Sequence, residues 1–306
     1  MKYFKLFIIA VVGVLLVRTF VFTSCTIPSS GMENSLYTGD RVIVNRWSYG
    51  FRVPFLSLFS YHRLLQKPVS GGEIVLFNNP LPAGGKSIDD KDIYISRCVG
   101  VPGDTLMLDN QLMLTAEKVF SPDSKLLYSY PPEKEDTLVQ TLKRLRIGNN
   151  ELVGCNEHGF IRNFSHYEVY LIRQELGEEV RLKDLRSVDK SDVHPFVIPR
   201  KGVPVRVYPW NARLLRNTIV CHEGKNADVK NDTLVVEGQK IYSYIFNKDY
   251  YWMASNNVAN LTDSRLFGLV PHDHLIGRAS FVWFSKDSEG GFLDGYRWNR
   301  FFQSVK

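Results

Sequence analysis

Several patterns that define common classes of protein are missing from this chain. The four cysteines show neither Cys-x-x-Cys spacing nor a histidine partner pattern, which argues against a zinc site. None of the seven histidines has ligand spacing, and we expect His272 and His274 to face solvent after Pro271. No basic run, nucleic-acid motif, internal repeat or low-complexity tract stands out. The sequence therefore predicts no metal, no cofactor and no nucleic-acid partner.

What the chain does contain is an ordinary globular composition with a mild positive charge. Hydrophobic residues make up 44% of its 306 positions and charged residues 23%, which excludes a largely disordered chain. The net charge of +6 is compatible with an anionic membrane surface. The sequence leaves open whether Cys155 and Cys221 pair in an oxidising compartment.

The N-terminus carries the one long apolar segment. Lys2 and Lys5 precede an apolar run over residues 6–17, which Arg18 interrupts and residues 19–22 extend. Together these residues are about long enough to span a bilayer as a helix of roughly 20 residues. The basic residues before the run favour a cytoplasmic N-terminus and an exported remainder. Arg18, near the outer end, can reach the lipid headgroups.

Two other fates of this segment are compatible with the sequence. It could be a cleaved signal peptide, since an apolar region of this length also fits that role. It could also be a lipoprotein signal, because Phe22-Thr23-Ser24-Cys25 loosely resembles a lipobox and would place a lipid on Cys25. Phe22 fits the first lipobox position poorly, and Arg18 breaks the apolar region. We therefore favour the transmembrane anchor.

Beyond the anchor, short strand-like runs separated by turn residues predominate. The region 121–192 differs, with amphipathic helices expected over Thr137–Leu145 and Lys183–Val188. We expect a mainly β fold: an antiparallel β-sheet core with an inserted smaller α+β domain and an N-terminal transmembrane helix. The strand signals cover 41–45, 73–77, 93–101, 105–114 and 195–207 and continue through Ile219, Leu234 and Ile241. The expected units are the anchor (1–22), a first core segment (23–120), the insertion (121–194) and a second core segment (195–306).

Four sequence blocks occur in a characteristic order behind the apolar N-terminus. They are Ile-Pro-Ser-Ser-Gly-Met-Glu-Asn-Ser-Leu at 27–36, continued at 39–44 and 49–50; Gly-Glu-Ile-Val-Leu-Phe at 72–77; Tyr-Ile-Ser-Arg-Cys-Val-Gly-Val-Pro-Gly-Asp at 94–104; and 255–257 with 263–265, 268–271 and 277–279, closed by Arg-Trp-Asn-Arg at 297–300. Each block alone is weak, because Gly-Asp and Pro-Gly-Asp turns are common. Taken in order, they closely resemble the bacterial type I signal peptidases, over about 20–120 and 195–306.

The resemblance implies an endopeptidase that removes signal peptides at the outer face of the bacterial cytoplasmic membrane. Members of the family use a serine nucleophile and a lysine general base, with no histidine and no metal. Serine is a poor nucleophile until a positioned base takes its proton. Lysine serves as that base only when burial lowers its pKa towards neutrality. A hydroxyl and backbone N–H groups then stabilise the oxyanion.

The residues that perform this chemistry are absent from the positions that the resemblance assigns to them. The family's nucleophile immediately precedes the methionine of the first block, and here that position is Gly31. The family's lysine immediately precedes the arginine of the third block, and here that position is Ser96. The serine that orients the lysine is replaced by Leu261. A leucine avoids the cost, on the order of 1–3 kcal/mol, of a buried hydroxyl without a partner.

Other positions of the family's site keep a suitable residue. Ser29 matches the hydroxyl that stabilises the oxyanion. Arg97, Asp263 and Arg265 match structural positions, and we expect Asp263 and Arg265 to form an ion pair near Arg97. The positions that line the family's substrate groove are Ile27, Pro28, Met32, Leu36 and Ile95. Without the resemblance, apolar residues of this kind would be assigned to an ordinary core.

An alternative dyad would need both a serine and a base. Ser30 is the alternative nucleophile, with Ser29 as a second choice, although a shift of one residue in extended chain turns a side chain to the opposite face. Lys91 precedes Ser96 by five residues, roughly 16 Å along a strand, which is beyond the reach of its side chain. Lys86 is farther away along the chain.

We therefore expect a signal peptidase-like membrane protein that is catalytically inactive. It would be a single-pass protein of the bacterial cytoplasmic (inner) membrane, with the bulk of the chain on the extracytoplasmic side. Its partners would be membrane lipids and exported pre-proteins or their signal peptides, or an active signal peptidase paralogue. One alternative is an active serine endopeptidase that uses Ser30 or Ser29 with an unrecognised base. Another is a lipidated surface binding protein that reuses the β scaffold.

Overall fold

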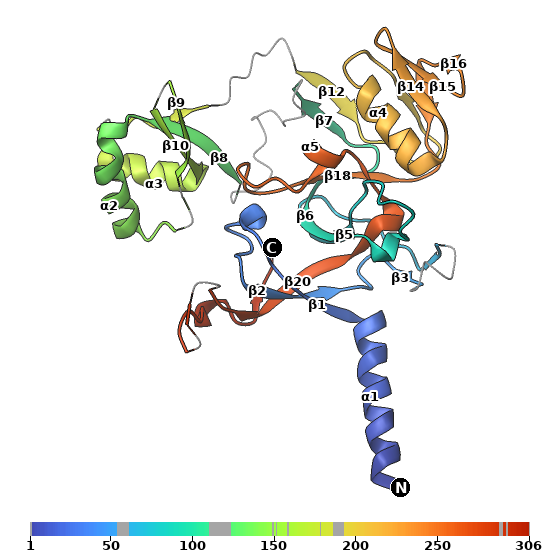
Figure 1. Cartoon of the computed structure of the whole chain (residues 1–306), viewed down its shortest axis with the longest axis horizontal. Coiled ribbons are helices and arrows are strands. Elements are labelled where there is room, and N and C mark those ends of the chain that lie inside the picture. The colour runs from blue at the N-terminus through green and yellow to red at the C-terminus, as the bar shows by residue number, and fades with distance from the viewer. Residues whose placement is uncertain are drawn as a thin grey trace.

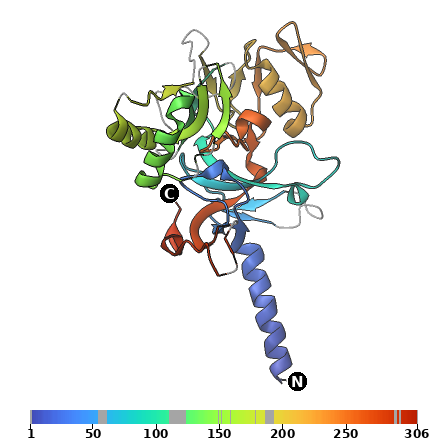
Figure 2. The ribbon, with the colours of Figure 1, turned by 60° about the vertical axis from the view of Figure 1, so that its left-hand side comes forward.

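The chain consists of a projecting helix, a central sheet and two smaller units (Figure 1). The computed structural model describes residues 2–53, 61–109, 124–148, 150, 152–157, 159–177, 179–185, 193–287, 290–291 and 293–305. Helix α1, Lys2–Phe20, extends away from the rest of the chain and carries the N-terminus at its far end (Figures 1 and 2).

The central sheet positions the segments that resemble a peptidase site. In the described residues it has eight antiparallel strands in the order β1-β2-β20-β5-β6-β18-β19, with β21 paired to β20. Ile74 and Leu76 of β5 join one core cluster, whereas Val75 and Phe77 join another on the opposite face. This sheet confirms the expected antiparallel β core. The bounds are β1 Phe22–Thr26, β2 Asp40–Asn45, β5 Ile74–Asn78, β6 Ile93–Gly100, β18 Tyr250–Ala254, β19 Val270–Pro271, β20 Leu275–Ser285 and β21 Gln303–Ser304.

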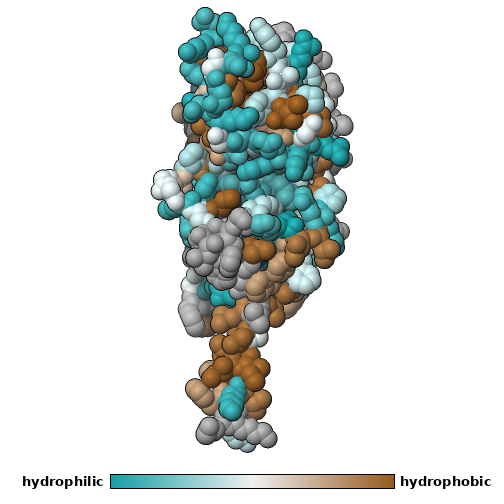
Figure 3. Space-filling view, turned by 90° about the vertical axis from the view of Figure 1, so that its right-hand side faces the viewer, coloured by the Kyte–Doolittle hydropathy of each residue, from teal (hydrophilic) through white to brown (hydrophobic). Residues whose placement is uncertain are grey.

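Helix α1 differs from the other helices in having apolar side chains around its whole circumference. It is 19 residues long, and Phe7, Ile9 and Val14 are among its many exposed apolar residues. The space-filling view shows it as a mostly hydrophobic stem below a largely hydrophilic body (Figure 3). Across the part of the chain that the structure describes, no helix meets the length and apolarity required of a membrane span.

The insertion forms a separate sheet of four strands within the described residues, in the order β11-β8-β10-β9. Helix α2 has acidic residues in its first turn and basic residues in its last, which complements the helix dipole. Ser165 and Glu168 form a capping box that starts α3. The helix expected over Thr137–Leu145 is confirmed by α2. The bounds are β8 Lys125–Tyr130, η3 Pro132–Lys134, α2 Glu135–Leu145, β9 Leu152–Asn156, β10 Gly159–Ser165, α3 His166–Leu176 and β11 Lys183–Asp184.

The helix expected over Lys183–Val188 is wrong where the structure describes it. Lys183 pairs with Ser129 of β8, so the segment begins as the edge strand β11. Residues 186–192 lie outside the described residues. An isolated helix of under two turns is marginal, and hydrogen bonds to a neighbouring strand outweigh its weak local preference.

A further core surrounds Trp252 and joins β18 to a group of small sheets. The strand signal at Ile219 is wrong: this fully buried residue begins a helical turn, η5, directly after α4. Its apolar character reflects burial, and a short apolar run does not distinguish a buried helical segment from a buried strand. The bounds are β7 Thr105–Leu108, β12 His194–Val197, β13 Pro204–Arg206, α4 Ala212–Thr218, η5 Ile219–Glu223, β14 Ala227–Lys230, β15 Thr233–Val236, β16 Gln239–Lys240 and β17 Ser243–Ile245. The remaining elements are η1 Ser30–Met32, β3 Phe51–Arg52, β4 Arg63–Leu64, η2 Ile88–Asp90, α5 Ser264–Phe267, η6 His272–His274 and η7 Trp298–Arg300.

The structure corrects the expectation about two histidines and answers the open question about two cysteines. His272 and His274 are buried rather than solvent-facing, because η6 turns their side chains inward between β19 and β20. Cys155 and Cys221 do not pair: both are free thiols, one on β9 of the insertion and the other in η5. The two cysteines belong to different units, which keeps them from meeting.

The burial of His272 predicts a pH-dependent stability. Its Nδ1 lies 3.0 Å from the hydroxyl of Tyr251, and burial, together with the charge of Arg63, lowers its pKa to about 4. The unfolded chain holds an ordinary histidine, with a pKa near 6.5, and therefore takes up a proton first as the pH falls. The free energy of unfolding should decline between about pH 6.5 and pH 4.

Between pH 7 and pH 5, the free energy of unfolding should fall in both proteins. We expect the fall to be about 2 kcal/mol smaller in His272→Asn than in the wild type, because the variant lacks the titrating imidazole. The measurement is urea denaturation of the detergent-solubilised chain at both pH values. His166→Asn changes an exposed histidine and serves as the control. An identical pH dependence in wild type and His272→Asn would show that folding leaves the pKa of His272 unchanged.

Candidate peptidase-like site

Gly31 occupies the position that the resemblance assigns to the nucleophile. Gly31 is buried in η1, directly after the chain leaves β1. A Cβ at Gly31 would lie 3.0 Å from the backbone oxygen of Asn260, 3.7 Å from Ser29 Oγ and 3.9 Å from Ser255 Oγ. The glycine therefore allows η1 to pack closely against the segment that carries Asn260.

Ser96, at the position that the resemblance assigns to the base, contacts the same segment. Ser96 is fully buried in β6, where it pairs with Val75 of β5. Its hydroxyl donates a hydrogen bond of 2.9 Å to the carbonyl oxygen of Thr262. Leu261 lies between Asn260 and Thr262 in the chain, so the segment 260–262 brings together the three positions that the resemblance assigns to the nucleophile, the base and the orienting serine.

Four serine hydroxyls, those of Ser29, Ser30, Ser96 and Ser255, lie around this segment. The Oγ of Ser30 accepts a hydrogen bond from Asn260 Nδ2 at 3.3 Å, and the Oγ of Ser255 accepts one from the backbone N–H of Thr262 at 3.1 Å. Within the described residues, none of the hydroxyls of Ser29, Ser30, Ser96 and Ser255 is hydrogen-bonded to a lysine, a histidine or a carboxylate. Ser255 was not expected to approach Gly31, although it stands where the family has glycine.

The two lysines considered from the sequence have other surroundings. Lys91 follows η2, and burial lowers its pKa, while Cys221 and Asp273 oppose that shift. Those groups belong to η5 and η6. Lys86 is exposed. Neither lysine therefore has the setting of a base for the hydroxyls around Gly31.

A lysine that the sequence analysis missed is fully buried close to the first block. Lys125 begins β8 of the insertion, and its Nζ lies 3.2 Å from Glu33 Oε2 and 4.0 Å from Glu168 Oε1. Glu33 directly follows Met32 and is itself buried. No local motif marks Lys125, because only the folded chain brings it to Glu33. A buried charge must be paired to be tolerated, and these carboxylates pair it.

The buried lysine is part of a polar junction that fastens the insertion to the fourth block. The backbone N–H of Lys125 donates to the carbonyl oxygen of Asn256 at 2.6 Å. Asn163 of β10 donates to Asn257 Oδ1 at 2.8 Å, and Asn257 Nδ2 donates to Glu33 Oε2 at 3.2 Å. The backbone N–H of Asn257 also donates to the carbonyl oxygen of Gly31 at 3.0 Å.

The positions that the resemblance assigns to structure form strong polar contacts. Asp263 is fully buried, pairs with Arg265 and accepts a hydrogen bond of 2.6 Å from the backbone N–H of Ser255. Arg97 donates to the carbonyl oxygen of Gly72 at 2.7 Å and to Ser35 Oγ at 2.8 Å. The expected Asp263–Arg265 ion pair is therefore present.

The expected groove residues divide into two groups. Ile27, Met32 and Leu36 are at most 2% exposed and belong to a core cluster under the central sheet. Pro28 is exposed and Ile95 is half-buried. Because a bound peptide contacts surface atoms, only Pro28 and Ile95 offer side-chain area to it in this conformation.

The backbone of β6 keeps an unpaired edge beside the site. β18 pairs with Arg97, Cys98 and Gly100, whereas β5 pairs with the other edge of β6 over Ile93–Arg97. Among the described residues, no strand pairs with Ile93–Ser96 on the side that β18 leaves open. An extended segment could add there through backbone hydrogen bonds.

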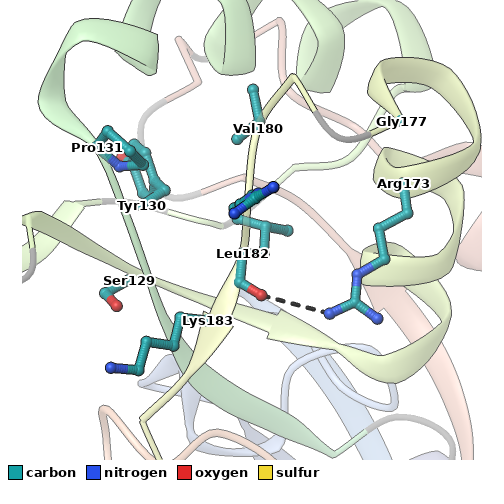
Figure 4. A pocket seen from close by; sticks show the side chains of 9 residues that line it. Ser129, Tyr130, Pro131, Arg173, Gly177, Val180, Leu182 and Lys183 are labelled. Carbon is teal, nitrogen blue, oxygen red and sulfur yellow. Dashed lines mark hydrogen bonds between the residues drawn. The ribbon is translucent and has the colours of Figure 1, made fainter.

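The insertion has a cavity of its own, which lies apart from these positions (Figure 4). It measures about 820 Å³ and is lined by Arg173 of α3, Arg181, and residues of β8 and β11 that include Ser129 and Lys183. No predicted site residue lines it. Ser129 and Lys183 are cross-strand neighbours, but Lys183 is exposed, whereas a lysine acting as a general base must be desolvated.

Comparisons with known proteins agree with the blocks identified in the sequence. The family model described as "Signal peptidase, peptidase S26" matches residues 1–159 and 211–284. The chain is 26% identical over 274 residues to signal peptidase I of Buchnera aphidicola subsp. Schizaphis graminum, covering 89% of this chain and 71% of that protein. It is 23% identical over 316 residues to signal peptidase I of Helicobacter pylori J99, covering 97% and 90%. It is 22% identical over 313 residues to signal peptidase I of Haemophilus influenzae, covering 96% of this chain and 72% of that protein.

The close packing of Gly31 predicts that a side chain at this position is costly. We expect Gly31→Ala to lower the free energy of unfolding by roughly 1–3 kcal/mol, because the added methyl group would press on the Asn260 carbonyl. Gly154→Ala is the matched control, since a Cβ at Gly154 meets nothing within 4 Å. Chemical denaturation measures both variants. Equal stability of the two variants would show that the 260–262 segment yields and could accommodate a nucleophile.

Proposed function

Because this chain belongs to the signal peptidase family, peptidase S26, we propose that it is a signal peptidase-like protein that binds signal-peptide segments without hydrolysing them. One observation carries the proposal. The base position holds Ser96, whose hydroxyl donates to the Thr262 carbonyl, and the nucleophile position holds Gly31. The site therefore has backbone and hydroxyl groups where the family's chemistry requires a nucleophile and a proton acceptor.

The loss of both groups removes the catalytic unit rather than weakening it. A nucleophile and its base act together, and without them only the contribution of oxyanion binding and substrate positioning remains, roughly 10³–10⁴-fold over water. Ser29 supports part of that remainder, since its Oγ lies 3.7 Å from where a Cβ at Gly31 would stand. Such a remainder is too small for turnover of secretory proteins.

Binding requires neither lost residue. A signal-peptide segment would add to the open edge of β6 at Ile93–Ser96 as an extended strand and contact Pro28 and Ile95. The partner would be an exported pre-protein or its signal peptide. The protein would thereby withhold such segments from an active signal peptidase paralogue in the same membrane, or present them to it.

The position of such a partner favours an anchor in the cytoplasmic membrane. Helix α1 exposes apolar side chains on every side, which is costly in water and favourable in lipid. Exposed aromatic side chains in the C-terminal segment, Trp298 and Phe302 among them, suit a membrane interface. Lys2 and Lys5 would then lie on the cytoplasmic side.

Lipidation at Cys25 is less compatible with the structure than an anchor. Cys25 pairs with Val42 within β1 and is partly buried, and burial raises the pKa of its thiol to about 11. A lipidated Cys25 would be the first residue of the mature chain. Residues 22–24, which pair with β2, would be lost from the edge of the sheet.

The first test of the proposal is hydrolysis. Purified full-length protein should not cleave a pre-protein that an active signal peptidase cleaves under the same conditions. Gly31→Ser and Ser96→Lys should each remain inactive, because nucleophile and base act as a unit. Gel analysis of the cleaved product is the measurement. Cleavage by the wild type that disappears in Ser30→Ala would contradict the proposal and identify Ser30 as the nucleophile.

The second test is binding to the open strand edge. Peptides ending in Ala-x-Ala should bind, and alternate N-methylation of the peptide should weaken binding at least tenfold by removing backbone donors. Ile95→Asp should weaken binding similarly, whereas Ile245→Asp, on the exposed face of β17, should not. Calorimetry or fluorescence titration measures each pair. Equal affinity for the methylated and unmethylated peptides would rule out strand addition.

The third test concerns the anchor. The chain should remain in the membrane fraction through alkaline extraction, and a reporter fused after residue 60 should be active outside the cytoplasm. The physical reason is that the apolar surface of α1 would stay buried in lipid at high pH. Peripheral contacts alone would not hold the chain in the membrane under those conditions. Release of a soluble form lacking the first two dozen residues would contradict the anchor.

A further inference from the structure

A groove lies where the projecting helix meets the central sheet, which we call the anchor groove. It encloses about 760 Å³ between α1, β1, β2 and β20, and its surface is mostly apolar. Val14 and Val17 line it from the helix, and Ile43 and Trp283 line it from the sheet. A Cβ at Gly13, on the same side of α1, would meet nothing within 4 Å, so the helix is open to an occupant there. The volume is typical of a ligand site.

Two arginines give the anchor groove a charge that the rest of its lining does not balance. Arg18 lies in the last turn of α1, and Arg41 lies on β2. The guanidinium of Arg41 is 5.9 Å from the ring centre of Trp283 and 5.3 Å from that of Phe284. Within the described residues, no carboxylate lines this groove, and neither arginine has an ion pair. Both side chains are exposed and free to meet an anion.

Polarity in the anchor groove changes along the helix axis. Residues one to two turns below Arg18, such as Val14, are apolar, whereas Arg18 and Arg41 stand at the end that joins the sheet. An occupant must therefore carry an extended apolar part and an anionic part at one end. An apolar partner helix would satisfy the lower part and leave both arginines without a counter-charge.

We propose that the anchor groove binds one anionic phospholipid, with an acyl chain along α1 and the phosphate between Arg18 and Arg41. This inference rests on the proposed membrane anchor, because the chain must lie in a bilayer to meet a lipid. Arginines bind phosphate by charge and paired hydrogen bonds, and a basic side chain near an anionic headgroup strengthens association roughly fivefold. The bound lipid would brace α1 against β1 and β2 and so set the height of the site above the membrane.

Trp283 provides a direct signal for occupancy of the anchor groove. Full-length protein is reconstituted in phosphatidylcholine vesicles that contain increasing amounts of phosphatidylglycerol with brominated acyl chains, which quench nearby tryptophans. The signal of interest is the quenching in the wild type minus that in Trp283→Phe. We expect this quenching to reach half of its maximum at a low mole fraction of brominated phosphatidylglycerol. In a parallel titration with brominated phosphatidylcholine, half-maximal quenching should require a much higher mole fraction.

The arginines supply the decisive variants. Arg18→Gln with Arg41→Gln should raise the fraction of brominated phosphatidylglycerol for half quenching by roughly tenfold or more. Arg213→Gln, an exposed arginine of α4, should leave it unchanged. Inorganic phosphate at millimolar concentration should not relieve the quenching, because it lacks the apolar part. Equal quenching by the two lipids, an unaltered double variant, or relief by inorganic phosphate would each overturn the lipid assignment.

Failure of this inference is distinguishable from failure of the anchor. A chain that leaves the membrane on alkaline extraction defeats the anchor and the lipid site together. A chain that stays in the membrane but shows no preference for anionic lipid defeats the lipid site alone.

Discussion

The buried carboxylate of Asp263 holds the segment on which the rest of the site is built. It is fully buried, and it accepts hydrogen bonds from the backbone N–H groups of Ser255 at 2.6 Å and Arg265 at 3.0 Å. The ion pair with Arg265 compensates a charge that would otherwise be costly in the interior. These contacts close the loop between Ser255 and Asp263 and present its backbone to the neighbouring elements.

Three segments that are distant in sequence depend on that loop. The carbonyl of Gly31 accepts from Asn257, the hydroxyl of Ser96 donates to Thr262, and the backbone N–H of Lys125 donates to Asn256. The anchor-proximal strand, the middle of the sheet and the insertion therefore meet on one loop. The loop thus holds the positions of Gly31 and Ser96 together through backbone groups.

The residues at the nucleophile and base positions fit their buried surroundings. Ser96 is fully buried, and its hydroxyl donates to a carbonyl oxygen, so it is not an orphaned polar group. Gly31 fits against the Asn260 carbonyl where a larger residue would be crowded. Lys125, the buried cation of this region, is held by Glu33 at 3.2 Å. The polar network thus supports a fixed arrangement of the insertion, which is compatible with a binding role.

The sequence alone was sufficient for the features that depend on local pattern. The ordered blocks identified the family, short strand-like runs bounded by turn residues located β2, β5 and β6, and amphipathic spacing located α2. Tertiary structure decided what depends on partners far along the chain. It paired Lys183 with Ser129, where the local pattern had indicated a helix, and it buried His272 and His274. It turned Met32 into the core and brought Lys125 to Glu33. A local pattern records the solvent exposure and backbone preference of one segment, whereas these outcomes follow from which segments pack together.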